Sequence, residues 1–236
     1  MNDNTVILAI DAGKYENLGI AWNQQKPITK ENFIESFCEE LEIRPSSKAI
    51  VAIEAPLFIP SGDLSKIAKA REDDIDKITG MSRPWSMSAC FSCGIQFLDI
   101  FFSKLPTDTK IYTSIDEFEE AETGILICEA FISGGSNNLK GDERKNFIKN
   151  YYNYHPQINC HNHDAECAVS LLEKMETIKK IEAAQKYINL PYLLTKDNIH
   201  LSFCGKANTG IIVKSPKPCF EPVAEQQEIL RIIFNQ

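Results

Sequence analysis

Four carboxylates of the sequence stand where an apolar strand ends or where a helix begins. Asp11, Glu54 and Glu129 each follow a run of four or five apolar residues, and Asp164 lies in the His-Asn-His-Asp-Ala run of residues 161–165. A buried strand places its last side chain at the edge of a sheet, and several such edges together concentrate negative charge that a cation stabilises. The sequence therefore predicts a metal site built from these four residues.

The ligand type narrows the chemistry of this site. Oxygen-only ligands favour Mg²⁺ or Mn²⁺ over zinc. Two such cations, held about 3.5 to 4 Å apart, activate a water and stabilise the leaving oxygen of a phosphodiester. We therefore expect Mg²⁺ or Mn²⁺ as the cofactor, with a two-metal site as one arrangement.

Each carboxylate also has a purely structural explanation. Asp11 can cap a turn, Glu54 precedes a proline loop, and Asp164 can cap a helix. The order of these three along the chain favours a site, whereas both interpretations stay open for Glu129.

The elements that must position these residues alternate between strands and helices. Two β-rich runs, 6–11 and 19–22, are joined by a polar turn and predict a hairpin. The run 48–54 is continuously apolar, which is typical of a strand buried on both faces. Further expected strands are 110–114 and 124–129, and the expected helices are one capped by Thr29, then 65–78, 88–105, 142–152 and one from Asp164 to about 187.

This order predicts an α/β fold with a mixed sheet flanked by helices. The 236 residues leave little room for two full domains, so residues 1–236 are expected to form one domain. Residues 190–236 are expected to form a small β-rich extension packed on it. Within that extension, 199–204 and 210–214 are candidates for a hairpin.

The composition limits the location and the partners of the protein. No stretch approaches the roughly 18 to 20 apolar residues that span a bilayer, and the first residues do not resemble a signal peptide, so we expect a cytoplasmic protein without membrane contact. The net charge of −8 argues against a broad nucleic-acid footprint, although an acidic protein can carry a local basic channel. Any nucleic-acid contact is expected to be short.

The eight cysteines are scattered through the predicted elements, which indicates free thiols. Cys90 and Cys93 form a Cys-x-x-Cys pair inside an apolar helix without a second pair, so they are interpreted as small core residues. His163 and Cys167 stand one helical turn apart and could both face a zinc ion. Because that spacing lacks a second half, His163 is instead expected to orient a carboxylate ligand.

Several short motifs resemble the RNase H-like superfamily, particularly RuvC-type resolvases: Asp11 on the first strand, Glu54 at the end of a central strand, and His163-Asp164-Ala165 opening a late helix. Within this superfamily the chain is similar to a broad prokaryotic family of predicted RNase H-like nucleases, catalogued as a domain of unknown function. The motifs that carry this similarity are Ile53-Glu54-Ala55-Pro56-Leu57, Glu129-Ala130-Phe131, Leu139-Lys140 with Arg144, His163-Asp164-Ala165 and Thr209-Gly210-Ile211-Ile212.

The resemblance implies a nuclease and gives each acidic residue a role. Asp11 takes the bridging metal position, Glu54 and Asp164 flank it, and Glu129 has an auxiliary or substrate-facing role. RNase H-like folds begin with three antiparallel strands, yet only residues 24–28 are available here for the third.

Basic residues near the acids are candidates for binding substrate phosphate. Arg grips a phosphate with two parallel hydrogen bonds, while Lys supplies a point charge. Lys140 and Arg144 carry the family-like spacing and are the preferred pair. The other candidates are Lys14, Arg71 and Arg83.

Two other functions remain open. The acidic balance also suits a non-catalytic binding or regulatory module that keeps the fold. The segment Asp11-Ala12-Gly13-Lys14 is similar to the phosphate loop of actin-like sugar kinases, which implies a small-phosphoester phosphotransferase or hydrolase. Those kinases need two copies of the fold, and this chain has one.

Overall fold

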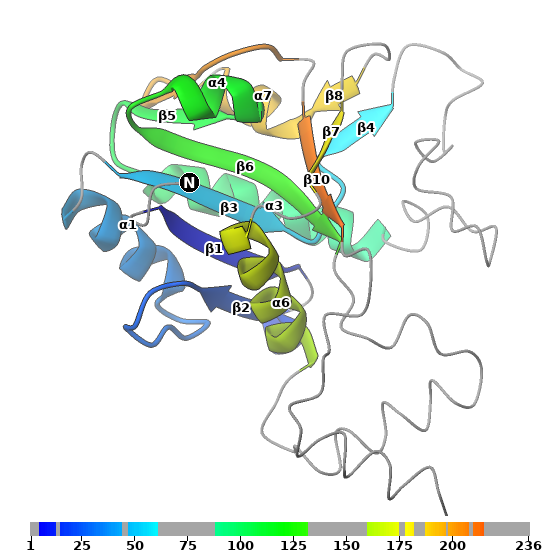
Figure 1. Cartoon of the computed structure of the whole chain (residues 1–236). Helices are drawn as coiled ribbons and strands as arrows, with labels where there is room; N and C mark the ends of the chain where they lie inside the picture. The colour runs from blue at the N-terminus through cyan, green and yellow to red at the C-terminus, as the bar shows by residue number, and fades with distance from the viewer. Residues whose placement is uncertain are drawn as a thin grey trace, which may run out of the picture.

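A mixed β-sheet with helices on both faces forms the centre of this computed structural model (Figure 1). The structure describes residues 5–12, 15–43, 47–60, 88–131, 160–174, 178–181, 187–196, 198–207 and 210–214. Within the helix that carries Asp164, the side chains of His163 and Asp164 are outside this description.

The sheet has eight strands in the described part of the chain, and most neighbours in it run parallel. Its central order is β2-β1-β3-β6, with β2 antiparallel to β1 and with β1, β3 and β6 parallel. Beyond β6, β5 pairs with the first part of this strand and is followed by β9, while β10 pairs with its last part and is followed by β7. These strands are β1 (Val6–Asp11), β2 (Gly19–Trp22), β3 (Lys48–Ile53), β5 (Thr109–Tyr112), β6 (Gly124–Phe131), β7 (Ile178–Ile181), β9 (Leu201–Phe203) and β10 (Gly210–Lys214).

Two short strands pair separately beside this sheet, and helices connect the rest. The two-stranded sheet joins β4 (Phe58–Pro60) to β8 (Tyr187–Asn189) in antiparallel fashion. The helices are α1 (Phe33–Ile43), α3 (Ser88–Lys104), α4 (Ile115–Glu120), α6 (Cys160–Lys174) and α7 (Leu190–Thr195), with a 3-10 turn η1 (Tyr15–Asn17) between β1 and β2.

Both faces of the sheet are covered by helices, and the side chains of its central strands are mostly apolar. Every residue of β1 is buried, as expected for a strand covered on both faces. Leu8 and Ile10 pack with α1 and α3 on one face, which we call the α3 face. Ile7 and Ala9 pack with α4 and α6 on the other, the α6 face (Figure 1). Successive side chains of a strand therefore point into two different helix layers.

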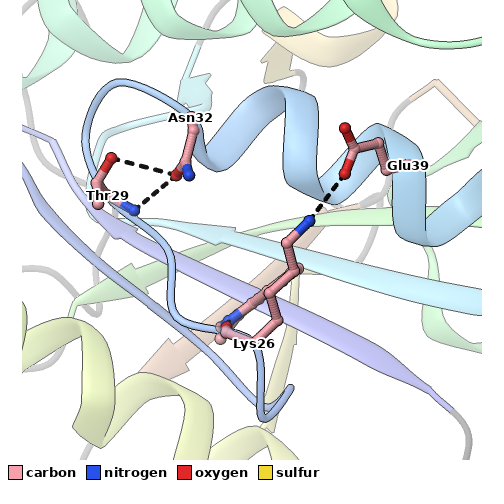
Figure 2. A network of polar contacts seen from close by, with 5 residues as sticks. Lys26, Thr29, Asn32 and Glu39 are labelled. Carbon is pink, nitrogen blue, oxygen red and sulfur yellow. Dashed lines mark hydrogen bonds and ion pairs between the residues drawn. The ribbon is translucent and has the colours of Figure 1, made fainter.

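The segment between β2 and α1 contains turns and no strand in residues 23–32, all of which are described. Polar contacts hold this segment against α1 (Figure 2). The Asn32 side chain accepts a hydrogen bond from the Thr29 amide at 2.7 Å, and Lys26 forms an ion pair with Glu39 of α1 at 2.9 Å. That ion pair is more than half exposed and adds little stability. The antiparallel part of the sheet thus stops at two strands.

The predicted hairpin of 6–11 and 19–22, the strand at 48–54 and the helix at 88–105 are all present as β1, β2, β3 and α3. The expected helix from Asp164 to about 187 is wrong beyond residue 174, because β7 and β8 follow. Residues 178–181 have a helix-compatible composition, but pairing with β10 overrides that local preference.

The expected C-terminal hairpin is also wrong. β9 pairs in parallel with β5, and β10 pairs in parallel with β6 and antiparallel with β7. β9 and β10 are therefore part of the main sheet. Alternation along a strand shows which residues are buried, but it does not identify the partner strand. The expected helices at 65–78 and 142–152 lie outside the described residues.

None of the helices in the described part of the chain is long and apolar enough to cross a lipid bilayer. The cysteines Cys38, Cys93, Cys128 and Cys204 are free thiols, which agrees with the expectation for these four. Cys93 of the Cys-x-x-Cys pair packs half-buried against the α3-face core.

A glycine lets α3 approach the sheet, and this contact can be tested. A Cβ on Gly94 would lie 2.5 Å from the Cβ of Ala55, so Gly94→Ala should lower the free energy of unfolding by about 1 to 3 kcal/mol. It should do so despite a gain in helix propensity of about 1 kcal/mol. Urea denaturation of the variant measures this change.

The matched control is Gln96→Ala on the exposed side of the same helix, which should change stability by less than about 0.5 kcal/mol. Adding Ala55→Gly to Gly94→Ala should recover stability, because it removes the opposing methyl group. A Gly94→Ala variant as stable as wild type would contradict this close contact.

Candidate metal centre

Asp11 and Glu54 lie at the ends of two neighbouring parallel strands. Ile10 of β1 is in register with Ile53 of β3, and the Glu54 amide donates to the Ile10 carbonyl oxygen at 2.8 Å, so the ladder continues past the last strand residue. Strands paired in this way lie about 4.8 Å apart. The backbones of Asp11 and Glu54 are therefore immediate neighbours at the carboxyl edge of the sheet.

The alternation of the strands places both residues on the α6 face. Ile7 and Ala9 precede Asp11 on that face, and Ile50 and Ala52 precede Glu54 there. Asp11 is only 7% exposed, and Glu54 is partly buried. Two carboxylates on neighbouring strand ends and facing the same side of the sheet repel each other when both are ionised, and a cation bound between them offsets that repulsion.

Helix α6, which carries Asp164, covers this end of β1 and β2 (Figure 1). Ala165 and Ala168 are almost fully buried against the α6-face core. The Asn162 side chain accepts the amide of Ile20 at 3.1 Å, and Ile20 is paired with Ile10, one residue before Asp11. The first turns of α6 are thereby held over the end of β1 that carries Asp11.

The structure thus brings Asp11, Glu54 and the backbone of Asp164 to one corner of the sheet. Among the side chains that the structure describes, no three from His, Cys, Asp and Glu lie close enough to hold a metal ion. A cation bound by Asp11 and Glu54 would draw its further ligands from side chains outside that description, such as Asp164, or from water, which Mg²⁺ commonly retains. The two described donors are hard oxygens and fit Mg²⁺ or Mn²⁺.

Glu129 has a different environment from the other acids. It is in register with Ile53, but Ile125 and Ile127 before it belong to the α3-face core, so its side chain lies on the opposite face from Asp11 and Glu54. It is fully buried, and its Oε1 accepts the amides of Leu57 at 2.7 Å and Phe58 at 2.8 Å. Its role as a metal ligand remains a prediction, and the structure places it beneath the loop that follows Glu54.

The charge of Glu129 also affects its neighbour in the strand. Burial, and secondly the negative charge of Glu129, raise the pKa of the Cys128 thiol well above its usual range. Cys128 is fully buried in the α6-face core and stays a neutral thiol at physiological pH. It is a core residue of β6.

The connection from β3 to β4, residues 54–57, carries Glu54 and is held at several points that the sequence did not reveal. Ala55 packs against Gly94 of α3, and the ring of Phe58 packs against Gly210 of β10, where a Cβ would meet it at 2.7 Å. The Leu57 carbonyl oxygen accepts the amide of Leu190 at 3.0 Å.

Sequence reasoning also missed Asn162 and a buried pair, Asn189 and Thr113, whose side chains are hydrogen bonded at 3.0 Å. Asn189 caps α7 by accepting the Tyr192 amide. The signal was present, because Asn before Leu-Pro is typical of a helix start.

The candidate phosphate-binding residues Lys14, Arg71, Arg83, Lys140 and Arg144 lie outside the described residues, and so do the side chains of the zinc alternative, His163 and Cys167. Two surface pockets of about 340 and 330 Å³ lie elsewhere on the described part of the chain. The first is at the opposite edge of the sheet, beside Lys110 and Gly124, and the second lies between Trp22 and Glu173. Neither is lined by Asp11, Glu54 or Glu129.

Comparisons of the chain with protein-family models, with curated proteins and with solved structures found no match. The chemistry of this corner is therefore inferred from the geometry of the strand ends.

Metal binding at this corner should appear in thermal stability. Mn²⁺ at about 100 times its dissociation constant adds about 2.7 kcal/mol, which corresponds to a rise in Tm of about 5 to 10 °C for a chain of this size. Asp11→Asn should remove most of this rise and should raise the Tm of the metal-free protein, because one of two repelling charges is gone.

Asp99→Asn is the matched control, since it removes an exposed carboxylate on α3 and should leave the Mn²⁺ response unchanged. Calorimetric scans with EDTA, Mg²⁺ and Mn²⁺ measure these differences. Identical wild-type scans with and without cation would contradict a metal centre.

Proposed function

We propose that this protein is a Mg²⁺- or Mn²⁺-dependent phosphodiesterase of RNase H-like fold that hydrolyses nucleic acid. The observation that carries the proposal is the placement of Asp11 and Glu54 on adjacent parallel strand ends, facing the helix that bears Asp164. Acidic residues from two strands and a helix at one corner form a site suited to two-metal hydrolysis.

The strand arrangement supports the same proposal. An antiparallel β1-β2 pair is followed across the sheet by the parallel strands β3 and β6, and a late helix covers the acidic corner. RNase H-like proteins combine these features with a third antiparallel strand, which residues 23–32 do not form here. The chain would therefore represent a shortened variant of that fold.

Each residue of the corner would have its own task in the reaction. When bound, the cations supply a water nucleophile at neutral pH and neutralise charge on the reacting phosphate. Asp11 would hold the shared metal position, with Glu54 and Asp164 on either side. The low exposure of Asp11 keeps bulk water from screening its charge.

Nucleic acid is the proposed substrate, and its contact area should be small. The net charge of −8 repels the phosphate backbone over most of the surface, so affinity would depend on a few local basic residues. Lys140 and Arg144 are the proposed phosphate contacts, because this pair carries the spacing of the family that the chain resembles.

Cleavage assays test the reaction itself. Wild-type protein with Mn²⁺ or Mg²⁺ should cleave a branched, single-stranded or hybrid nucleic acid, and Asp11→Asn should reduce the rate at least about 10³-fold, the equivalent of about 4 kcal/mol of charge stabilisation. Asp99→Asn should cleave like wild type. Cleavage that persists in Asp11→Asn would refute this site, and a lack of cleavage together with tight binding of a small phosphorylated ligand would favour a phosphoester enzyme instead.

The salt dependence of nucleic-acid binding tests the proposed phosphate contact of Lys140. Lys140→Ala should weaken nucleic-acid binding across all sequences and reduce the slope of log affinity against log salt by about 1, since one phosphate contact is lost. Fluorescence anisotropy from about 50 to 200 mM salt measures the slope. An unchanged slope would exclude Lys140 from the contact.

A further inference from the structure

Glu129 is the one fully buried carboxylate among the described side chains, and it lies next to Glu54 in the sheet but on the opposite face. It is in register with Ile53, the residue just before Glu54, yet it faces the other side of the sheet. A ligand of the metal corner would have to reach the α6 face, and Glu129 points to the α3 face. Its effect on the site must therefore pass through a part of the chain that lies between them.

The intervening structure is the loop that starts at Glu54. Oε1 of Glu129 accepts two backbone amides of this loop end, from Leu57 at 2.7 Å and from Phe58 at 2.8 Å. Both bonds are short and have a carboxylate acceptor, which makes them stronger than bonds between neutral groups. Without this acceptor, two buried amides would lose their partner.

The distance along the chain from these bonds to Glu54 is very short. At one end the backbone amide of Glu54 donates a hydrogen bond to the Ile10 carbonyl oxygen, and at the other end the amide of Leu57 donates one to Glu129. Only Ala55 and Pro56 lie between the two points, and both are buried. Ala55 is in contact with Gly94, and the proline ring restricts its own backbone.

We propose that Glu129 is a positioning residue for Glu54, which holds the 54–57 loop from beneath so that the Glu54 carboxylate stays beside Asp11. This inference rests on the proposed metal-dependent function. It replaces direct metal binding by Glu129 with an action through the Leu57 and Phe58 amides. Residues that orient metal ligands in this indirect way typically change metal affinity about 10- to 100-fold when removed.

A single substitution separates the two roles. Both bonds end on the same oxygen, and the Gln side chain offers an equivalent amide oxygen, so Glu129→Gln can keep both bonds without the charge. Glu129→Ala removes the acceptor altogether. Loss of the charge should weaken Mn²⁺ binding if Glu129 is a metal ligand, whereas a residue that acts through the Leu57 and Phe58 amides keeps that action with Gln.

The experiment combines amide hydrogen exchange at Leu57 and Phe58, measured by NMR without metal, with Mn²⁺ affinity measured by calorimetry. Glu129→Ala should accelerate exchange of these two amides by at least about 10-fold and weaken Mn²⁺ binding about 10- to 100-fold. Glu129→Gln should keep both the protection and an affinity close to wild type. Glu117→Ala is the control, because Glu117 likewise accepts a backbone amide, that of Lys206, in a loop on the far side of β6.

Each outcome decides a distinct point. Unchanged protection of Leu57 and Phe58 in Glu129→Ala would overturn the loop anchor. Loss of Mn²⁺ binding in Glu129→Gln with both amides still protected would overturn positioning and return Glu129 to the metal ligands. No Mn²⁺ binding by wild type would refute the proposed function and with it any metal-site role of Glu129, while the exchange data would still show whether Glu129 holds the loop.

Discussion

The buried carboxylate of Glu129 and the two backbone amides that it accepts connect the parts on which the site depends. Burying a charged group in a sheet is costly unless its hydrogen bonds are satisfied, and the amides of Leu57 and Phe58 supply two of these bonds. The same bonds direct the chain from the end of β3 into β4, and the Leu57 carbonyl then accepts the amide of Leu190. One carboxylate thus ties the central sheet to the small β4-β8 sheet.

The parallel core explains why acidic residues from distant segments can meet at all. β1, β3 and β6 run in the same direction and in register, so Asp11, Glu54 and Glu129, which lies two residues before the end of β6, come to the same edge of the sheet. Alternation then divides these residues between the faces: Asp11 and Glu54 are directed to the helix that carries Asp164, and Glu129 to the helix that approaches Ala55. Similar residues at similar strand ends can therefore have separate tasks.

Two glycines make close contacts with the chain that follows Glu54. Gly94 allows α3 to pack on Ala55, and Gly210 allows β10 to cross the ring of Phe58. Such contacts leave the residues around Glu54 little room to shift, and a metal ligand must be held to within a fraction of an ångström to be effective. Rigid packing on one face of the sheet thereby supports chemistry proposed for the other.

The sequence by itself determined the elements of the centre: the continuous apolar runs of β1 and β3 predicted buried strands, and the acids after them predicted a charged sheet edge. Local pattern is enough there, because burial on both faces demands apolar residues throughout. Only the tertiary structure decided that β9 and β10 join the main sheet and that 178–181 is a strand, since the partner of a strand is set by distant residues. It also decided the face of Glu129, because strand register, rather than residue type, determines which side of a sheet a carboxylate occupies.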